Sequence, residues 1–355
     1  MNRRDWLGVL LMAPASGWVG CSGKRAAGTA SRLLVSANPH LSMSGLYLAQ
    51  ELGYFAQAGL TVELRQIPNA VLAVPLLASG RLDVAFSTLS PSFINAIAKG
   101  AHLRIVAGRE IASPTCGSAG AVYGNCRAFP QGLANPRQLK GKRIAVNSQA
   151  GFSGFCLDVL LASAGMGPGE VQIVELRRSE ASAALTGGQI DALLANDFDK
   201  DPVSMAPQVV RGVAMGQILP NFQFSHVMFG ERLLAGDPAI GAGFLSAYLR
   251  GAQEFLRGRT PRFLEDHARA YGLDPKLAQA ACRETFTPDG TIQLQNLQYF
   301  IDWAVHKGYC PHPIRAAQLV DTRFLDRAHG RSPEGNRPGR QAASQERTQA
   351  KDHDS

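Results

Sequence analysis

Short apolar runs alternate with stretches of helical periodicity over the first third of the chain. The pattern predicts strands at residues 33–36, 61–67, 83–86 and 103–108, and helices at 46–52, 70–77 and 93–98. Ser90 and Pro91 mark the start of the last helix, with a hydroxyl at the cap and proline at the first helical position. Strands and helices that alternate in this way are typical of a mostly parallel sheet covered by helices.

The alternation begins again near residue 139. It predicts strands at 144–146, 171–176 and 191–195, and helices at 155–164 and after a cap at Ser179. A strand follows at 225–229, and the later segments are helical in period: 240–256, 261–271, 275–283, 294–306 and 313–320. We expect these helices to return to the first lobe. The chain past Asp326 has no apolar periodicity, and we expect it to be disordered.

Two stretches of the chain share the pattern Asn-x4-(Met/Phe)-Ser-Gly. They are residues 38–45 and 147–154, which lie 109 residues apart and match without a gap. A second echo joins residues 77–85 to 185–193, where Asp83 and Asp191 each follow a glycine turn and are interpreted as turn residues. We infer that one strand–loop–helix lobe was duplicated. A chance echo among common loop residues is the alternative.

The repeated loops are the first candidates for a binding site. In open parallel sheets, ligands bind beyond the carboxyl ends of the strands, where loops lead into helix N-termini. Met43 and Phe152 occupy equivalent positions that suit apolar walls. The hydroxyls at these turns belong to Ser42, Ser44, Ser148 and Ser153. The alternative for each serine is that it only caps its helix.

Other polar residues are predicted to reach the same crevice. They are Ser87 and Thr88 after the third strand, Asn196 and Asp197 after the equivalent strand of the second lobe, Asn69 after the second strand, and His40 in the first repeated loop. An exposed loop histidine without a function is the alternative for His40.

Composition is that of a folded globular protein. Of 355 residues, 45% are apolar and 18% are charged, which argues against a disordered chain and a polytopic membrane protein. The net charge of +8 has two interpretations, an anionic ligand in a cleft or dispersed surface lysine and arginine, and no basic run is interleaved with aromatic residues. We therefore expect no nucleic-acid partner. The length predicts two domains.

Sequence motifs of catalysis are absent. The chain has no G-x-S-x-G elbow, no P-loop, no H-E-x-x-H or C-x-x-C pattern and no dinucleotide-binding fingerprint. We therefore expect a protein that is not an enzyme and that uses no cofactor and no metal.

The N-terminus has the features of an export signal. Arg3 and Arg4 precede an apolar run, as in twin-arginine signals. Residues 18–21 resemble a bacterial lipobox, in which Cys21 becomes the acylated first residue; a plain signal peptide is the alternative. We expect a periplasmic or cell-surface protein with a lipid anchor at Cys21.

Five cysteines remain once Cys21 is set aside, and an exported chain lies where disulfides persist. An odd number leaves at least one cysteine unpaired. We expect two pairs, with Cys156 buried as a free thiol. The pairs are Cys116 with Cys126, around a hairpin-like stretch, and Cys282 with Cys310, around a helical one.

The run from Gly45 to Leu60 reproduces the pattern A-x-x-x-G-Y-F-x-x-x-G-L. It resembles the signature of the SsuA/NMT1/THI5-like substrate-binding proteins. The resemblance continues through residues 77–83 and 139–146 and covers residues 33–325. It implies binding loops at residues 42–44, 87–88 and 148–153, the last of which includes Gln149.

The resemblance implies an α/β, two-lobed type II periplasmic-binding-protein fold, each lobe being a mixed, mostly parallel sheet flanked by helices. We expect a signal peptide, lipobox and linker at 1–30 and a disordered tail at 327–355. The first lobe is expected at 31–110 and 222–326, and the second at 111–221.

The resemblance also implies a function: an extracytoplasmic solute-binding protein of an ABC importer. Its ligand would be a small molecule of sulfonate, nitrate, taurine or pyrimidine type, held between the lobes. The expected partners are that ligand, an ABC permease with its ATPase, and the membrane through the lipid anchor; the chain is expected to be a monomer. The alternatives are a thiamine-pyrimidine biosynthesis enzyme on the same fold and an extracytoplasmic ligand sensor.

Overall fold

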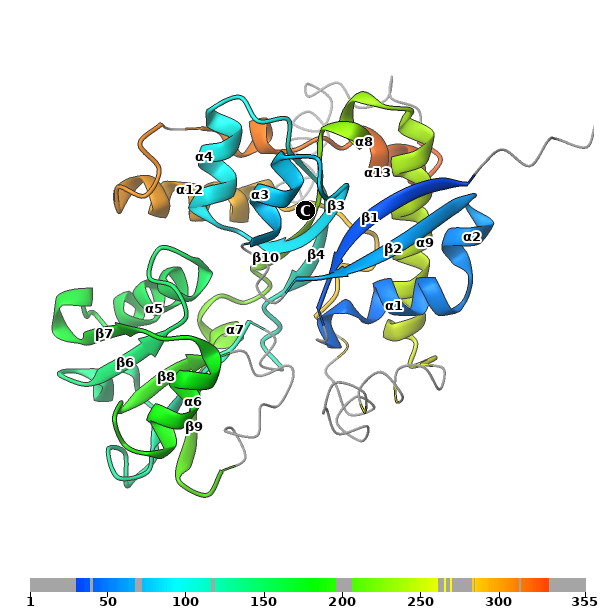
Figure 1. The fold of residues 1–355 in the computed structure, drawn as a ribbon. Coiled ribbons are helices and arrows are strands. Elements are labelled where there is room, and N and C mark those ends of the chain that lie inside the picture. Colours follow the sequence, from blue (N-terminus) through cyan, green and yellow to red (C-terminus); the bar gives the residue numbers. More distant parts are fainter. Residues whose placement is uncertain are drawn as a thin grey trace, which may run out of the picture. The chain divides into compact units, whose positions relative to one another are not determined.

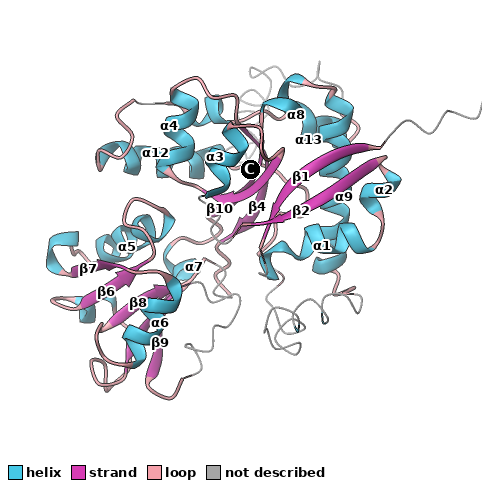
Figure 2. Cartoon of the chain, viewed as in Figure 1, coloured by secondary structure: helices cyan, strands magenta, loops and turns pink. Residues whose placement is uncertain are grey.

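The computed structural model describes residues 30–331, apart from gaps at 39–40, 68–71, 116–118, 196–205, 261–264, 266–268, 270–282, 284 and 313. These residues form two five-stranded sheets flanked by helices (Figure 1). Both sheets are mixed, with parallel and antiparallel neighbours (Figure 2). The predicted fold class is confirmed.

The first sheet has the strand order β2-β1-β3-β10-β4. Its strands are β1 (Ser31–Ala37), β2 (Leu60–Gln66), β3 (Val84–Thr88), β4 (Arg104–Ile111) and β10 (Gln223–Phe229). β1 runs parallel to β2 and β3, whereas β10 is antiparallel to both of its neighbours.

The second sheet has the order β7-β6-β8-β5-β9. Its strands are β5 (Ala121–Asn125), β6 (Arg143–Val146), β7 (Gln172–Glu175), β8 (Ala192–Ala195) and β9 (Val209–Ala214). β6, β7 and β8 stand in the places of β1, β2 and β3, and the antiparallel β5 stands in the place of β10. The repeat read in the sequence is therefore also a repeat of sheet topology.

The repeated aspartates stabilise the central strand of each sheet. The Leu34 N–H donates to Asp83 Oδ2 at 2.7 Å, and the Asp83 N–H donates back to the Leu34 carbonyl at 2.8 Å. In the second sheet, the Arg143 N–H donates to Asp191 Oδ2 at 2.8 Å, and the Asp191 N–H returns to the Arg143 carbonyl at 2.9 Å. Both aspartates have a structural role, but their carboxylates bond to the neighbouring strand, a contact that the interpretation as turn residues did not include.

Alternate residues of the first sheet enter different cores, as a strand's period of two requires. Ala85 faces a core that includes Phe93 of α4 (Pro91–Ala98) and Phe300 of α12 (Leu294–His306). Phe86 faces the opposite core, where its ring lies 6.5 Å from that of Phe244 in α9 (Pro238–Leu256). Other helices with residues in these two cores include α1 (Ser44–Glu51), α2 (Tyr54–Gln57), α3 (Ala73–Ala78), α8 (Glu231–Ala235) and α13 (Arg323–Ala328).

Helix α9 returns to the first sheet and packs closely on α1, as predicted. A Cβ atom at Gly251 would lie 2.2 Å from the Gly45 carbonyl oxygen, so this crossing needs glycine. The second sheet carries α5 (Phe152–Ser163), α6 (Arg178–Thr186) and α7 (Met215–Ile218). Of these, α6 packs on Tyr123 and Leu193 through Leu185.

Several predicted elements differ from the observed ones. Of the helix predicted at 313–320, the described residues 314–320 form a short 3-10 helix at Ala316–Leu319, because Val320 pairs with Ile105 as a β-bridge. Helix α6 is capped at Arg177, whose N–H donates to the Glu180 carboxylate, and not at Ser179. The predicted helices at 261–271 and 275–283 lie almost entirely outside the described residues.

The folded part also ends later than predicted. Helix α13 continues through Ala328 because Phe324 and Leu325 are anchored in the core, and it is followed by Gly330 at a φ of +70°. The Arg331 N–H donates to the Asp326 carbonyl at 2.8 Å. Residues 327–331 therefore belong to the helix terminus, and the rest of the predicted tail lies outside the described residues.

His226 of β10 has no solvent exposure, and within the described residues neither ring nitrogen has a hydrogen-bond partner. Burial, and secondly the charge of Arg109, lowers the pKa of His226 from 6.5 to about 3. The folded protein therefore holds the neutral ring. The unfolded chain binds a proton once the pH falls below about 6.5, so acid favours unfolding in the window down to about 3.

We expect the wild-type protein to lose about 2–3 kcal/mol more unfolding free energy than a His226→Leu variant between pH 7.5 and 4.5. The leucine fills a comparable buried volume and cannot take up a proton. Urea titration of both proteins at the two pH values measures the difference. Equal losses would show that His226 does not set the acid sensitivity.

Candidate functional site

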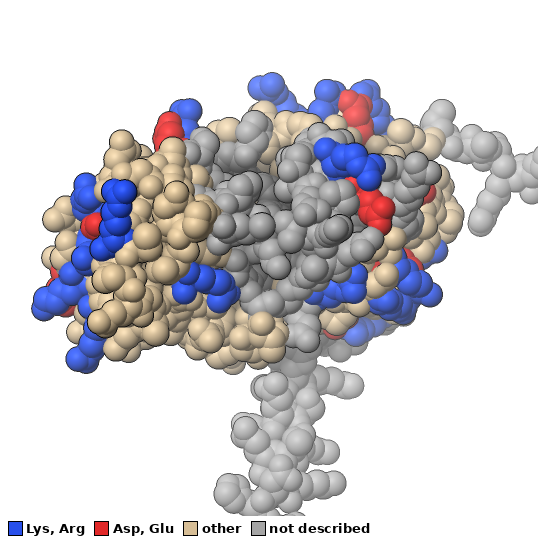
Figure 3. All heavy atoms as spheres, turned by 90° about the horizontal axis from the view of Figure 1, so that it is seen from below, with Lys and Arg blue, Asp and Glu red and all other residues tan. Residues whose placement is uncertain are grey.

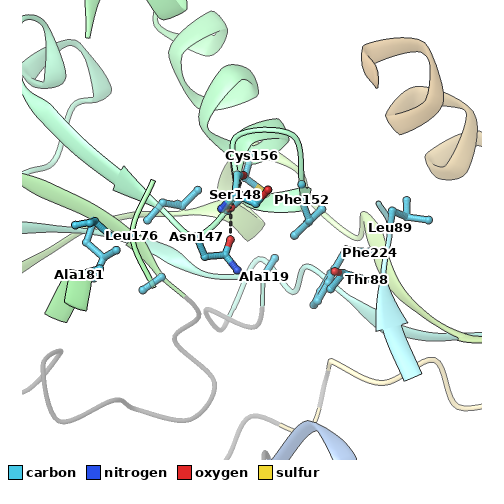
Figure 4. Close-up of a pocket in the computed structure, with 15 residues that line it drawn as sticks. Thr88, Leu89, Ala119, Asn147, Ser148, Phe152, Cys156, Leu176, Ala181 and Phe224 are labelled. Carbon is cyan, nitrogen blue, oxygen red and sulfur yellow. Dashed lines mark hydrogen bonds between the residues drawn. The ribbon is translucent and has the colours of Figure 1, made fainter. Parts of the chain in front are cut away.

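One cavity of about 210 Å³ is bounded by residues of both sheets (Figure 4). Thr88, Leu89 and Phe224 contribute from the end of β3 and the start of β10 in the first sheet. The turn between β6 and α5 contributes from the second sheet. Among the described residues the full lining is Thr88, Leu89, Ala119, Asn147, Ser148, Gly151, Phe152, Ser153, Cys156, Leu176, Ala181, Leu193, Leu194, Ala195 and Phe224.

The turn before α5 is held by its own hydrogen bonds. The Ser148 N–H donates to Ser153 Oγ at 3.2 Å, and the Gly154 N–H donates to the Ser148 carbonyl at 3.1 Å. Ser153 Oγ donates to Asn147 Oδ1. A Cβ atom at Gly154 would lie 1.9 Å from the Gln149 carbonyl oxygen, so only glycine allows this tight turn.

An aromatic wall joins the two sheets at the cavity. The rings of Phe152 and Phe224 are stacked at 5.1 Å with an interplanar angle of 17°, and Phe152 lies 6.2 Å from Phe222. Behind this wall, α5 meets α12. Asp158 Oδ2 of α5 accepts the Trp303 indole N–H of α12 at 2.8 Å and lies 2.8 Å from Lys307 Nζ.

The side chains that line the cavity, as far as the structure describes them, are neutral. Asn147, Ser148, Ser153 and Thr88 offer amide and hydroxyl groups, while most of the other lining residues are apolar. Burial raises the pKa of the Cys156 thiol, which keeps it protonated. The arrangement can hold a small molecule by hydrogen bonds to the amide and hydroxyl groups and by contact with the apolar side chains.

The structure brings four of the predicted site residues together around this cavity: Thr88, Ser148, Phe152 and Ser153. Another four lie outside the described residues: His40, Asn69, Asn196 and Asp197. Gln149 is exposed in the same turn, and its backbone N–H donates to Glu175 at 2.8 Å, but its side chain is not part of the lining.

The first repeated loop does not line the cavity in the way the second does. Met43 was predicted to be an apolar wall, but it is 2% exposed and its Sδ accepts from Arg109 Nη1 at 3.2 Å. Ser44 and Ser87 are buried, and the Ser42 carbonyl accepts from Arg109 Nη1 at 3.0 Å. None of the described residues of the first repeated loop lines this cavity, and the prediction of matching binding loops stays a prediction. The turn of the second copy meets β3 and β10 of the first sheet instead.

Sequence reasoning missed Asn147, Leu89 and Phe224 as lining residues. Asn147 carried a usable signal, since it is the first residue of the repeated pattern. Phe224 carried none, because it follows the second lobe in the sequence and reaches the cavity only when β10 joins the first sheet.

Among the described residues, Cys126, Cys156 and Cys310 form no disulfide with one another. Cys156 is buried as predicted. Burial raises the pKa of Cys310 to about 11. The expected partners Cys116 and Cys282 lie outside the described residues, as does Cys21, so the two disulfides and the lipid anchor stay predictions.

Within the described part of the chain, no helix is both long and apolar enough to cross a membrane. On the face shown in Figure 3, lysine and arginine side chains stand in separate small groups between uncharged surface.

Residues 40–258 match the family model described as NMT1/THI5 like. The chain belongs to the NMT1/THI5-like family. The matched range contains the Gly45 to Leu60 signature, so the resemblance inferred from the sequence is confirmed.

A Haemophilus influenzae protein whose name assigns it to thiamine biosynthesis is 26% identical over 167 residues. The match covers 46% of this NMT1/THI5-like chain and 50% of the relative, so this chain spans about half of the relative's length.

Solved structures share the fold. The alkanesulfonate-binding protein SsuA from Xanthomonas axonopodis pv. citri, bound to MOPS, has a TM-score of 0.67 at 18% identity, over 82% of this chain and 98% of that one. The periplasmic nitrate-binding protein NrtA from Synechocystis PCC 6803 has a TM-score of 0.66 at 12% identity, over 84% and 87%. The desulfurization enzyme DSZB has a TM-score of 0.60 at 14% identity, over 84% and 99%. The fold is thus found in both binding proteins and an enzyme.

Proposed function

We propose that this protein is the extracytoplasmic solute-binding component of an ABC importer and captures a small molecule in the cavity. The observation that carries the proposal is the cavity itself, because Thr88 and Phe224 come from one sheet and Asn147 and Ser148 from the turn at the other. A ligand that touches both sheets has more contacts when they are close together, so it favours that state. The family and the binding proteins that share its fold support the same function.

The proposal includes the cellular setting. The ligand-bound form would be recognised by an ABC permease with its ATPase, and the protein would be exported by the twin-arginine signal and anchored at Cys21 as a monomer. The chain would comprise a first lobe at 31–110 with 222–326 and a second lobe at 111–221. The ligand would be of sulfonate, nitrate, taurine or pyrimidine type.

A melting-temperature screen with MOPS, taurine, nitrate and the 4-amino-5-hydroxymethylpyrimidine precursor of thiamine tests the function. A compound present at 100 times its Kd should stabilise the protein by about 2.7 kcal/mol, which corresponds to roughly 5 °C. No shift with any compound at millimolar concentration would contradict the proposal.

A variant with Ser148→Ala and Ser153→Ala is expected to bind the best compound about 10-fold more weakly by calorimetry, since two hydroxyls at the cavity are lost. Its melting temperature should stay within a few degrees of the wild type, because the turn lies at an accessible helix start. Unchanged affinity would remove both serines from the site.

An enzyme is the second candidate function. It is favoured by the name of the Haemophilus influenzae relative and by the fold shared with DSZB. Mass spectrometry of each screening compound after incubation with the protein distinguishes the two functions. A solute-binding protein returns the compound unchanged, whereas an enzyme converts many equivalents.

A further inference from the structure

The amide of Asn147 stands at the edge of the cavity with its oxygen facing Ser153 Oγ. Ser153 Oγ accepts the Ser148 N–H at 3.2 Å, and its one proton has two acceptors within reach, Asn147 Oδ1 and the Ser148 carbonyl at 2.9 Å. The amide oxygen is therefore engaged on the side of the α5 turn. Figure 4 shows the amide nitrogen turned away from that turn toward Ala119, another lining residue.

The Asn147 Nδ2 group has no hydrogen-bond partner within the described part of the chain, although it belongs to a cavity-lining side chain. A primary amide nitrogen is a donor only, with two N–H bonds. The lining also contains an aromatic wall of Phe152, from the same turn, and Phe224, from the first sheet. The site thus combines an amide donor with an aromatic wall.

Resting on the proposed function, we infer that Asn147 Nδ2 donates a hydrogen bond to an acceptor atom of the ligand, and that Ser153 is a positioning residue that keeps the amide in this orientation. The ligand class is a small molecule with an acceptor oxygen or nitrogen at one end and an apolar portion that lies against Phe152 and Phe224. Without Ser153, the amide can rotate and present either its oxygen or its nitrogen, which weakens a directed bond.

The experiment is calorimetric titration with whichever of MOPS, taurine, nitrate or the aminopyrimidine binds the wild-type protein most tightly. Asn147→Asp replaces the donor by an acceptor of the same shape and should weaken binding about 30-fold; Asn147→Ala should weaken it about 10-fold. Asn135→Asp is the matched control. It makes the same change outside the cavity lining, where a carboxylate can still accept the Arg137 N–H, and it should leave the affinity unchanged.

The role of Ser153 is tested by non-additivity. Ser153→Ala should weaken binding about 5-fold in the wild-type background and less than 2-fold in the Asn147→Ala background, and Ser153→Thr should restore most of the affinity. A purely structural serine would cost the same in both backgrounds, and that result overturns the positioning role.

An Asn147→Asp variant that binds within 2-fold of the wild type, with an unchanged melting temperature, overturns the donor assignment while leaving the solute-binding function in place. No binding of any compound by the wild-type protein contradicts the proposed function, and this inference with it.

Discussion

Replacing Arg109 by methionine is expected to lower the free energy of unfolding by about 3–5 kcal/mol. Arg109 is 7% exposed and forms an ion pair with Glu110, whose side chain is 3% exposed. Its guanidinium also donates to Ser225 Oγ at 2.8 Å and to the Ser42 carbonyl at 3.0 Å. Methionine keeps an unbranched apolar stem but takes the Arg109 guanidinium away from the buried Glu110 carboxylate. Urea denaturation of both proteins at pH 7 measures the cost.

Two control variants test whether the cost of Arg109→Met comes from breaking a buried ion pair and not from breaking any ion pair. Arg32→Met breaks an exposed pair with Glu63, in which the arginine side chain is 64% exposed, and should cost less than about 1 kcal/mol. Adding Glu110→Gln to the Arg109→Met variant should recover part of the loss, because the buried carboxylate that has lost its Arg109 partner is then replaced by a neutral amide. A loss below 1 kcal/mol for Arg109→Met alone would contradict the importance of this pair.

Gly154→Ala is expected to weaken binding of the best screening compound by about 100-fold or more, which corresponds to about 2.7 kcal/mol. The added Cβ would lie 1.9 Å from the Gln149 carbonyl oxygen, so the turn that carries Asn147 and Ser148 has to move. If this turn moves, the Asn147 and Ser148 side chains no longer lie where they can bind a ligand that also contacts Phe224. Calorimetric titration measures the loss.

Gly169→Ala is the matched control, since a Cβ there meets no atom within 4 Å and its φ is not positive. This variant should bind like the wild type and change stability by less than about 0.5 kcal/mol. Melting curves of both variants show whether Gly154→Ala is folded. A folded Gly154→Ala protein that binds within threefold of the wild type would falsify the role of the turn.

The repeat in the sequence predicted much of the architecture. Residues 38–45 and 147–154 share a pattern because β1 and β6 hold the same place in their sheets, and both lead through a turn into a helix. Local signals such as the Ser90 cap, whose Oγ accepts the Phe93 N–H, were also sufficient to place α4. These features depend on residues close together in the chain.

Features that depend on distant residues could not be predicted in the same way. Met43 and Phe152 hold equivalent positions in the repeat, yet Arg109 covers Met43 while Phe152 stacks on Phe224 at the cavity. The sequence placed β5 within a hairpin-like stretch. Its antiparallel position between β8 and β9 depends on the topology of the whole sheet, which the local sequence pattern does not contain. The cavity is lined partly by residues of a local turn and partly by residues that only the assembled sheets bring together. For this reason only four of its lining residues were predicted from the sequence.

A crystal structure of the protein grown with the compound that raises its melting temperature most tests the central claim directly. The account predicts electron density for that compound between Phe224 and Thr88 on one side and Asn147 and Ser148 on the other. Density for the compound at another place, such as the groove between α12 and residues 314–318, with this cavity holding only water, would contradict it.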